Sequence, residues 1–175
     1  FNMGLSKNAF EASNGFGNIH PGEDPDLSIR LWNLGFRTKL IKEAFVYHKR
    51  RISWEKFQIQ VNKFGKARPI LNSWYPQHTK ITFWFPSLFL LGFVVSVLLT
   101  FVKFPYFLGV YVLYFGLLFG SSLLMNKSFK IAAYSVYAAI IQFYGYGKGF
   151  LLSFYKIFVL KLEPQKAFPE LFFKK

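Results

Sequence analysis

The hydrophobic pattern divides the chain near residue 80 into a polar part and an apolar part. From Ile81 to Val102 no residue carries a charge, and Lys103 separates this run from a second uncharged run, Phe104 to Met125. Each run of 22 residues would form a helix about 33 Å long, which is enough to cross a hydrocarbon core of about 30 Å. The pattern predicts an antiparallel pair of transmembrane helices over 81–102 and 104–125.

A third apolar segment follows a short polar loop, and its pattern allows two interpretations. The stretch 131–147 is apolar but contains a glutamine and four tyrosines, and the glycine-rich run 145–149 is expected to break or bend a helix. The range from 131 to about 160 either crosses the membrane once or lies in its interface. We assign 81–162 to a membrane region and 163–175 to a cytoplasmic tail.

Residues 1–80 have the pattern of a folded polar domain. An apolar stripe at helical spacing ends at Leu34, and Gly35 stands where a helix stop is expected. The next stretch, Phe36 to His48, alternates loosely between apolar and polar residues, which predicts one or two short strands.

A further helix is predicted from Ser53 to Ala67. Ser53 is a suitable N-cap, because its hydroxyl can accept a hydrogen bond from a backbone N–H of the first turn. The apolar residues of the segment share one stripe, namely Trp54, Phe57, Val61 and Phe64. We expect this stripe to face lipid or the first span, and we expect Pro69 and then Pro76 to end the domain.

The most informative local feature is the acidic segment that opens the first predicted helix. Glu23, Asp24 and Asp26 place three carboxylates within four positions, and Pro25 follows Asp24 directly. One interpretation is structural, with Asp24 as the N-cap and Pro25 as the first helical residue. The other is catalytic, because a carboxylate held at a helix N-terminus can accept a proton. Spacing alone favours the cap.

Composition indicates a membrane protein. The chain is 53% hydrophobic and 22% aromatic and carries a formal net charge of +14, a combination typical of membrane proteins with cationic cytoplasmic edges. The distribution of Lys and Arg places residues 1–80 and the loop 126–130 in the cytoplasm. A nucleic-acid partner is not expected, because no nucleic-acid module is recognisable and anionic lipid accounts for the charge.

The sequence offers little for metal or thiol chemistry. It has no cysteine, which excludes disulfides and thiolate metal ligands. The histidines, which are His20, His48 and His78, lack the close spacing of a ligand set.

The acidic segment and its flanks resemble the family 2 glycosyltransferases. The run GEDPDLSIRLWNLGF over 22–36 is similar to the acidic motif of that family, usually written E-D-x-D-L-x-x-R-L. Upstream, 2–5 and 14–16 resemble its N-M-A-L and G-G-F segments, and downstream 60–68 resembles the Q-x-x-R-W region of membrane-bound members. In that region Lys63 and the next residue stand in place of the Arg and Trp.

The resemblance implies a fold and two catalytic residues. The implied fold of residues 1–80 is α/β, as the C-terminal portion of a Rossmann-like GT-A domain, and an α-helical transmembrane region follows it. Asp24 matches the general base of the family, which takes the proton of the acceptor hydroxyl in inverting transfer. Glu23 is expected to orient the site or the acceptor.

Further residues receive roles from their position in or beside the motif. Asp26 is expected in the first turn, where the helix dipole favours an acid, and Arg30 is expected to pair with a carboxylate. Gln60, Lys63 and Arg68 either bind the acceptor or the diphosphate, or belong to a cationic amphipathic helix that lies on lipid.

The resemblance also implies what the full-length protein does. The nucleotide-binding half of the family, with its D-x-D motif and a divalent metal ion (Mg²⁺ or Mn²⁺), precedes the acidic motif. The chain begins at Phe1, so we interpret it as a C-terminal fragment that binds no metal or cofactor and is inactive alone.

Two functions follow for the full-length protein. The first is an inverting glycosyltransferase of the hexosyltransferase type. It would move a sugar from a nucleotide-sugar donor to a glycan or lipid-linked acceptor at the cytoplasmic face of the inner (plasma) membrane, as in polysaccharide and cell-envelope biosynthesis. The alternative is a non-catalytic membrane scaffold or subunit.

Overall fold

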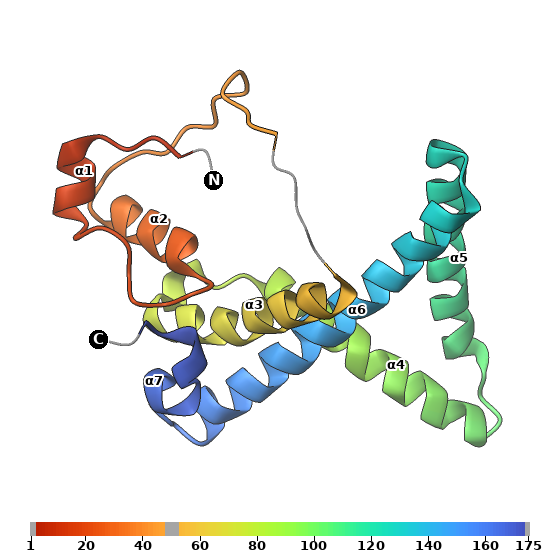
Figure 1. Ribbon diagram of the computed structural model, residues 1–175. Helices are drawn as coiled ribbons and strands as arrows, with labels where there is room; N and C mark the ends of the chain where they lie inside the picture. The colour runs from red at the N-terminus through yellow and green to blue at the C-terminus, as the bar shows by residue number, and fades with distance from the viewer. Residues whose placement is uncertain (1–2, 48–52, 174–175) are drawn as a thin grey trace.

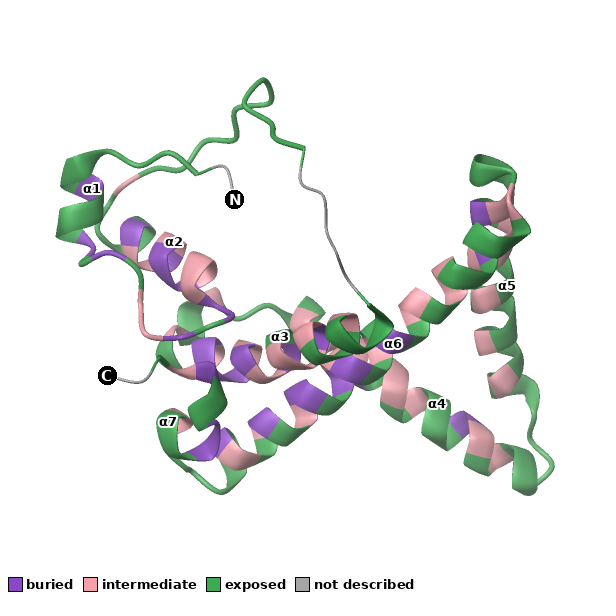
Figure 2. Ribbon diagram, in the orientation of Figure 1, coloured by how far each residue is buried: buried purple, intermediate pink, exposed green. Residues whose placement is uncertain are grey.

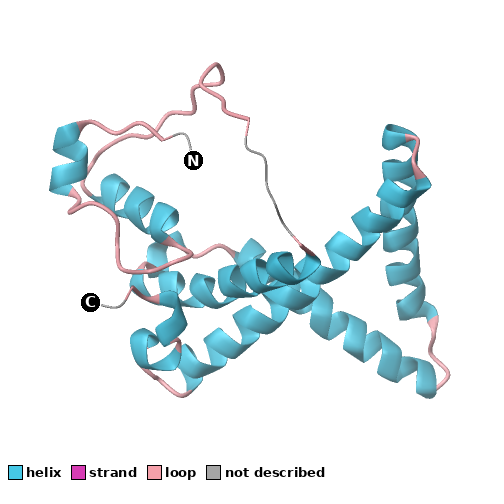
Figure 3. Cartoon of the chain, viewed as in Figure 1, coloured by secondary structure: helices cyan, strands magenta, loops and turns pink. Residues whose placement is uncertain are grey.

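The structure, a computed structural model, describes residues 3–47 and 53–173, and in these ranges it contains helices but no strand (Figure 3). The elements are α1 (Lys7–Ala12), α2 (Glu23–Asn33), α3 (Trp54–Trp74), η1 (Pro76–His78), η2 (Ile81–Trp84), α4 (Phe85–Phe101), α5 (Tyr106–Asn126), α6 (Phe129–Phe154), η3 (Tyr155–Val159), α7 (Pro164–Ala167) and η4 (Pro169–Leu171). Helix α3 lies along α6 at the centre, α4 extends away from this pair, and α5 runs back to the first part of α6 (Figure 1).

The α/β fold predicted for residues 1–80 is therefore wrong for the described residues. The strands expected from Phe36 onward are an extended loop through residue 47, and His48 lies outside the described residues. Leu40 is 84% exposed and Tyr47 94% exposed. Loose alternation does not form a strand by itself, because the backbone groups need a neighbouring strand as a partner.

Helix α2 begins two residues earlier than the cap interpretation requires. Its N-cap is Gly22, with φ 131° and no side-chain hydrogen bond, and Glu23 is the first helical residue. The prediction of Asp24 as N-cap is therefore wrong. The acidic side chains still lie in the first turn, where the positive end of the helix dipole stabilises negative charge.

The predicted end of α2 at Gly35 is confirmed. Gly35 has φ 85°, and its N–H donates to the carbonyl of Trp32, while the N–H of Phe36 donates to the carbonyl of Leu31, both at 3.0 Å. This pair of bonds is a Schellman motif, which requires a left-handed residue at the position that Gly35 occupies.

Helix α3 begins as predicted but ends later. The hydroxyl of Ser53 accepts a hydrogen bond from the N–H of Lys56 at 3.3 Å, which confirms the cap. The helix continues through Pro69 to Trp74. A proline inside a helix costs about 3 kcal/mol, and here the cost is offset because Ala67, Pro69 and the two residues after it are buried.

Two helical segments are long enough and apolar enough to cross a membrane, namely Ile81–Phe101, which combines η2 and α4, and Tyr106–Asn126, which is α5. Only 11% and 6% of these apolar stretches are buried inside the protein (Figure 2). The core helix of a soluble protein would be mostly buried. The exposed apolar surface therefore favours lipid as its environment.

The glycine-rich run does not break a helix. Helix α6 is continuous from Phe129 to Phe154 and passes into one π-helical turn. A side chain at Gly149 would overlap the backbone of Asn62 on α3, and a side chain at Gly65 would overlap the backbone of Tyr146 on α6. The glycines therefore let the α3 and α6 backbones approach closely, and helix packing overrides the weak helix propensity of glycine.

The C-terminal segment folds back onto α3 and the loop before α2. Phe168 and Leu171 are buried in one cluster with Ile19 and Ile70. The N–H of His20 donates to the carbonyl of Leu171 at 2.7 Å. The segment therefore fixes the chain immediately before the acidic residues.

Candidate functional site

The acidic segment is anchored through Asp26. This aspartate is 4% exposed, and one of its carboxylate oxygens accepts hydrogen bonds from Arg30 Nε at 3.1 Å and Nη2 at 2.7 Å. The expectation that Arg30 pairs with a carboxylate is confirmed. A buried carboxylate needs such partners, because an unpaired charge is costly away from water.

The same guanidinium holds the loop that connects α1 to α2. Arg30 Nη2 donates to the carbonyl of Gly15 at 2.8 Å, and Nη1 donates to the carbonyl of Ser13. A side chain at Gly17 would overlap the Asp26 carboxylate, so the loop passes directly over the ion pair. The planar fork of arginine suits this arrangement, because its several N–H donors can bind three acceptors at once.

Tyr75, at the end of α3, completes the anchor. Its hydroxyl donates to the second oxygen of Asp26 at 2.6 Å. Burial, and then the hydrogen bond to the Asp26 carboxylate, raise the pKa of Tyr75 to about 12. The phenol therefore stays protonated and remains a donor at neutral pH, which links α2 to α3.

Glu23 is held by its surroundings. Its carboxylate accepts a hydrogen bond from the N–H of Gly22 at 2.9 Å and lies 2.9 Å from Nδ1 of His20. Burial alone would raise the pKa of Glu23, but backbone hydrogen bonds and His20 outweigh it and keep the pKa below its usual value. Glu23 therefore stays ionised, and its orientation is fixed.

Asp24 differs from both neighbouring acids. Within the described residues its carboxylate forms no hydrogen bond and no ion pair, although it is half-buried. Burial, and next the negative charge of Glu23, raise the pKa of Asp24 above its ordinary value of 3.8. Adjacent carboxyls with oppositely shifted pKa values are an arrangement that divides orienting and basic roles between two groups.

The residues predicted on α3 do not form one cluster. Lys63 lines a pocket between α3 and α6, and Gln60 is half-buried outside that pocket. Arg68 instead stacks on Phe83, with its guanidinium carbon 4.1 Å from the ring centroid. In the described part of the chain, no hydrogen bond or ion pair joins these three side chains to Glu23 or Asp24.

The described residues contain no group of three or more His, Cys, Asp or Glu side chains that could hold a metal ion. Glu23 and His20 form a pair only. These ranges therefore offer a divalent ion no set of three such side chains.

Sequence reasoning did not find Tyr75, Lys66 or Lys148. The Asp26–Arg30 pair has the i, i+4 spacing of a helical ion pair, which was a readable signal. Tyr75 is 49 positions from Asp26, and no local pattern joins them. Lys66 and Lys148 line the same pocket as Lys63, but α6 lies far away in the sequence.

Comparison with known proteins identifies the family. The family model for "Glycosyl transferase family group 2" matches residues 2–146. No curated protein and no solved structure matches the chain. The matched range covers most of the chain, so the chain belongs to glycosyl transferase family group 2, which confirms the resemblance.

Proposed function

We propose that this member of glycosyl transferase family group 2 transfers a hexose, with inversion, from a nucleotide sugar to a glycan or lipid-linked acceptor, using Asp24 as the general base. Family membership supports glycosyl transfer in general. The assignment to Asp24 is carried by its carboxylate, which is half-buried, has a raised pKa and is unpaired within the described residues. The other two acids of the segment are fixed by hydrogen bonds.

The proposed reaction is a single displacement. The Asp24 carboxylate takes the proton of the acceptor hydroxyl as that oxygen attacks the anomeric carbon of the donor sugar. A new C–O bond forms on one face, the bond from the anomeric carbon to the diphosphate breaks on the other, and the nucleoside diphosphate leaves. A base with a raised pKa suits this step, because proton transfer is most effective when the pKa approaches the working pH.

The neighbouring groups supply orientation. Glu23 is fixed by Gly22 and His20, and an ionised Glu23 beside Asp24 increases the basicity of Asp24. The Asp26–Arg30 pair and Tyr75 hold the helix start that carries both acids. A base that is held in position contributes more than a mobile one, because the reacting atoms need near-attack geometry.

The α3 residues receive the acceptor-side role in this proposal. The Lys63 ammonium carries no ion pair in the described part of the chain, so its charge is available to an anionic acceptor or to the leaving diphosphate. Gln60 lies one turn before it on the same helix. Arg68 has its guanidinium face on Phe83 and one hydrogen bond to Tyr146, and its remaining N–H groups can serve a phosphate oxygen.

The proposed location is the cytoplasmic face of the inner (plasma) membrane. The two long apolar helices support membrane association. Of the charges near them, Lys127 and Lys130 follow α5, whereas Lys103 alone lies in the turn between α4 and α5. The positive-inside rule then favours a cytoplasmic acidic segment, where nucleotide sugars are available.

The proposal is tested on the full-length protein in membrane vesicles with a panel of radiolabelled nucleoside-diphosphate hexoses. Incorporation of label into a glycan or a lipid, with the anomeric configuration of the product opposite to that of the donor, is the expected result. If no donor is turned over and yet the protein is required for assembly of another transferase, the non-catalytic subunit is the correct function.

A further inference from the structure

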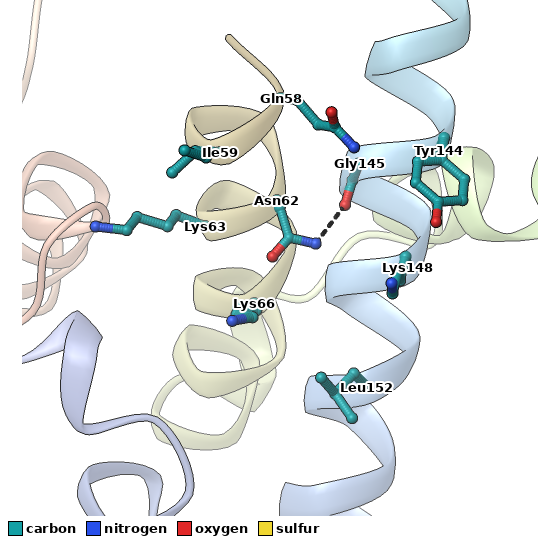
Figure 4. A pocket seen from close by; sticks show the side chains of 9 residues that line it. All are labelled: Gln58, Ile59, Asn62, Lys63, Lys66, Tyr144, Gly145, Lys148 and Leu152. Carbon is teal, nitrogen blue, oxygen red and sulfur yellow. Dashed lines mark hydrogen bonds between the residues drawn. The ribbon is translucent and has the colours of Figure 1, made fainter. Parts of the chain in front are cut away.

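A pocket of about 460 Å³ between α3 and α6 is lined by three lysines (Figure 4). Its lining residues are Gln58, Ile59, Asn62, Lys63, Lys66, Tyr144, Gly145, Lys148 and Leu152. The side chain of Asn62 donates to the carbonyl of Gly145 at 3.0 Å and joins the two walls. None of the lining residues is acidic, so the pocket is cationic.

The charge of these lysines is largely uncompensated. Lys66 Nζ lies 2.9 Å from a carboxylate oxygen of Glu170, which fixes the ammonium but leaves two of its three N–H donors available. Lys148 is exposed and lies over the ring of Tyr144, 5.7 Å from its centroid. Neither Lys63 nor Lys148 forms an ion pair within the described residues. Figure 4 shows the Lys63 side chain extending away from α6.

The pocket lies at the level where the first long apolar helix begins. Gly147, between the lining residues Tyr144 and Lys148, packs against the backbone of Pro86 at the start of α4. The hydroxyl of Ser87 donates to the carbonyl of Gly147 at 3.5 Å. The start of a transmembrane helix lies at the headgroup depth of the bilayer, which is also where lipid phosphates lie.

The rim of the pocket is apolar. Ile59 is 51% exposed, Tyr144 44% and Leu152 39%. A cationic interior beside exposed apolar side chains matches a ligand with a phosphate at one end and a hydrocarbon chain at the other. A soluble anion would use the lysines and leave this rim in water.

We propose that the pocket between α3 and α6 binds an anionic lipid phosphate, with Lys66 and Lys148 on the phosphate and Ile59 and Leu152 on the hydrocarbon chain. The phosphate belongs either to a bilayer phospholipid or to a phosphate-linked acceptor, and the chemistry of recognition is the same. The inference rests on the membrane association in the proposed function, but it does not depend on sugar transfer.

The test is lipid binding by the purified full-length protein in detergent, measured by native mass spectrometry. The probes are phosphatidylglycerol, zwitterionic phosphatidylcholine and a polyprenyl phosphate. The pocket variant is Lys148→Gln, which leaves the Lys66–Glu170 bridge intact. The matched control is Lys39→Gln, which removes the same charge from an exposed loop outside the pocket.

The wild type should bind phosphatidylglycerol or the polyprenyl phosphate in preference to phosphatidylcholine. The pocket variant should bind about fivefold more weakly, and the control should bind like the wild type. Binding of both anionic lipids indicates a general lipid site, and binding of the polyprenyl phosphate alone indicates an acceptor site.

Three results would overturn the inference. They are equal binding of phosphatidylcholine, unchanged binding by the pocket variant, and equal loss in the pocket variant and the control. The outcome is separable from the proposed function, because Asp24→Asn should abolish transfer and leave lipid binding unchanged. A protein that transfers sugar without any lipid preference refutes this site alone.

Discussion

Replacing Asp26 by Asn should loosen the acidic segment, although the change alters only one atom of the side chain. The Asp26 side chain is 5% exposed, and its carboxylate is the shared acceptor for Arg30 and Tyr75. An asparagine has one acceptor oxygen in place of two. Its amide N–H₂ would face either the guanidinium, which can only donate, or the phenol, which would have to accept instead of donating.

The magnitude follows from the burial of the pair. Removal of one partner of a buried ion pair costs about 3–5 kcal/mol, because the other charge is left unpaired. The Arg30 side chain is 24% exposed and keeps its bonds to the carbonyls of Ser13 and Gly15. We therefore expect about 3 kcal/mol, at the lower end of that range.

The measurement is hydrogen exchange of the α2 backbone amides in the detergent-solubilised full-length protein. A loss of about 3 kcal/mol in the opening free energy should accelerate their exchange about a hundredfold. Asp24→Asn is the matched control and should leave exchange unchanged, since that carboxylate has no hydrogen-bond partner within the described residues. Exchange that stays within threefold of the wild type in the Asp26 variant would refute the anchoring role.

Three further predictions concern different parts of the chain. Because the pKa of Asp24 is raised and the base acts when deprotonated, the acid limb of the pH profile of kcat/KM should have an apparent pKa above 3.8. An acid limb at or below 3.8 contradicts this. With no native cysteine, an impermeant thiol reagent applied outside should label Lys103→Cys and miss Lys127→Cys, and the reverse pattern inverts the topology. Gly149→Ala should lower the melting temperature, because the added methyl group meets the α3 backbone. The control Gly109→Ala has open space around the added methyl group and should leave the melting temperature unchanged or raise it. Equal effects of the two changes would exclude close packing at Gly149.

Local signals in the sequence predicted local structure well. Ser53 caps α3, and Gly35 ends α2, because each acts on backbone groups within a few residues of itself. The uncharged runs before and after Lys103 form the two long apolar helices, because a prediction from the hydropathy of a long window needs few assumptions.

Sequence patterns that are compatible with two different structures gave wrong predictions. The alternation in residues 36–47 is compatible with either a strand or an exposed loop, and only the presence of a neighbouring strand decides between the two. Glycines such as Gly149 either weaken a helix or let a second helix approach, and the partner helix α3 is about eighty positions away in the sequence. The cap position shifted from Asp24 to Gly22 because glycine accommodates the φ of 131° at the entry to α2.

The candidate site was partly readable. The motif pointed to Glu23 and Asp24 as candidates. The structure adds that the Glu23 carboxylate is fixed by hydrogen bonds, whereas the Asp24 carboxylate is unpaired within the described residues. Tyr75 reaches Asp26 through tertiary structure alone. The lysine pocket forms only when α3 and α6 meet, which no single helix pattern could reveal.

The most direct test of the central claim compares transfer and donor binding in the Asp24→Asn variant of the full-length protein. The account predicts that transfer falls by a factor of about 10² to 10⁴, the usual contribution of a general base. Binding of the nucleotide sugar should stay within twofold of the wild type, because the change removes a base and leaves the Asp26 anchor intact. Near-normal transfer by this variant would contradict the assignment of Asp24.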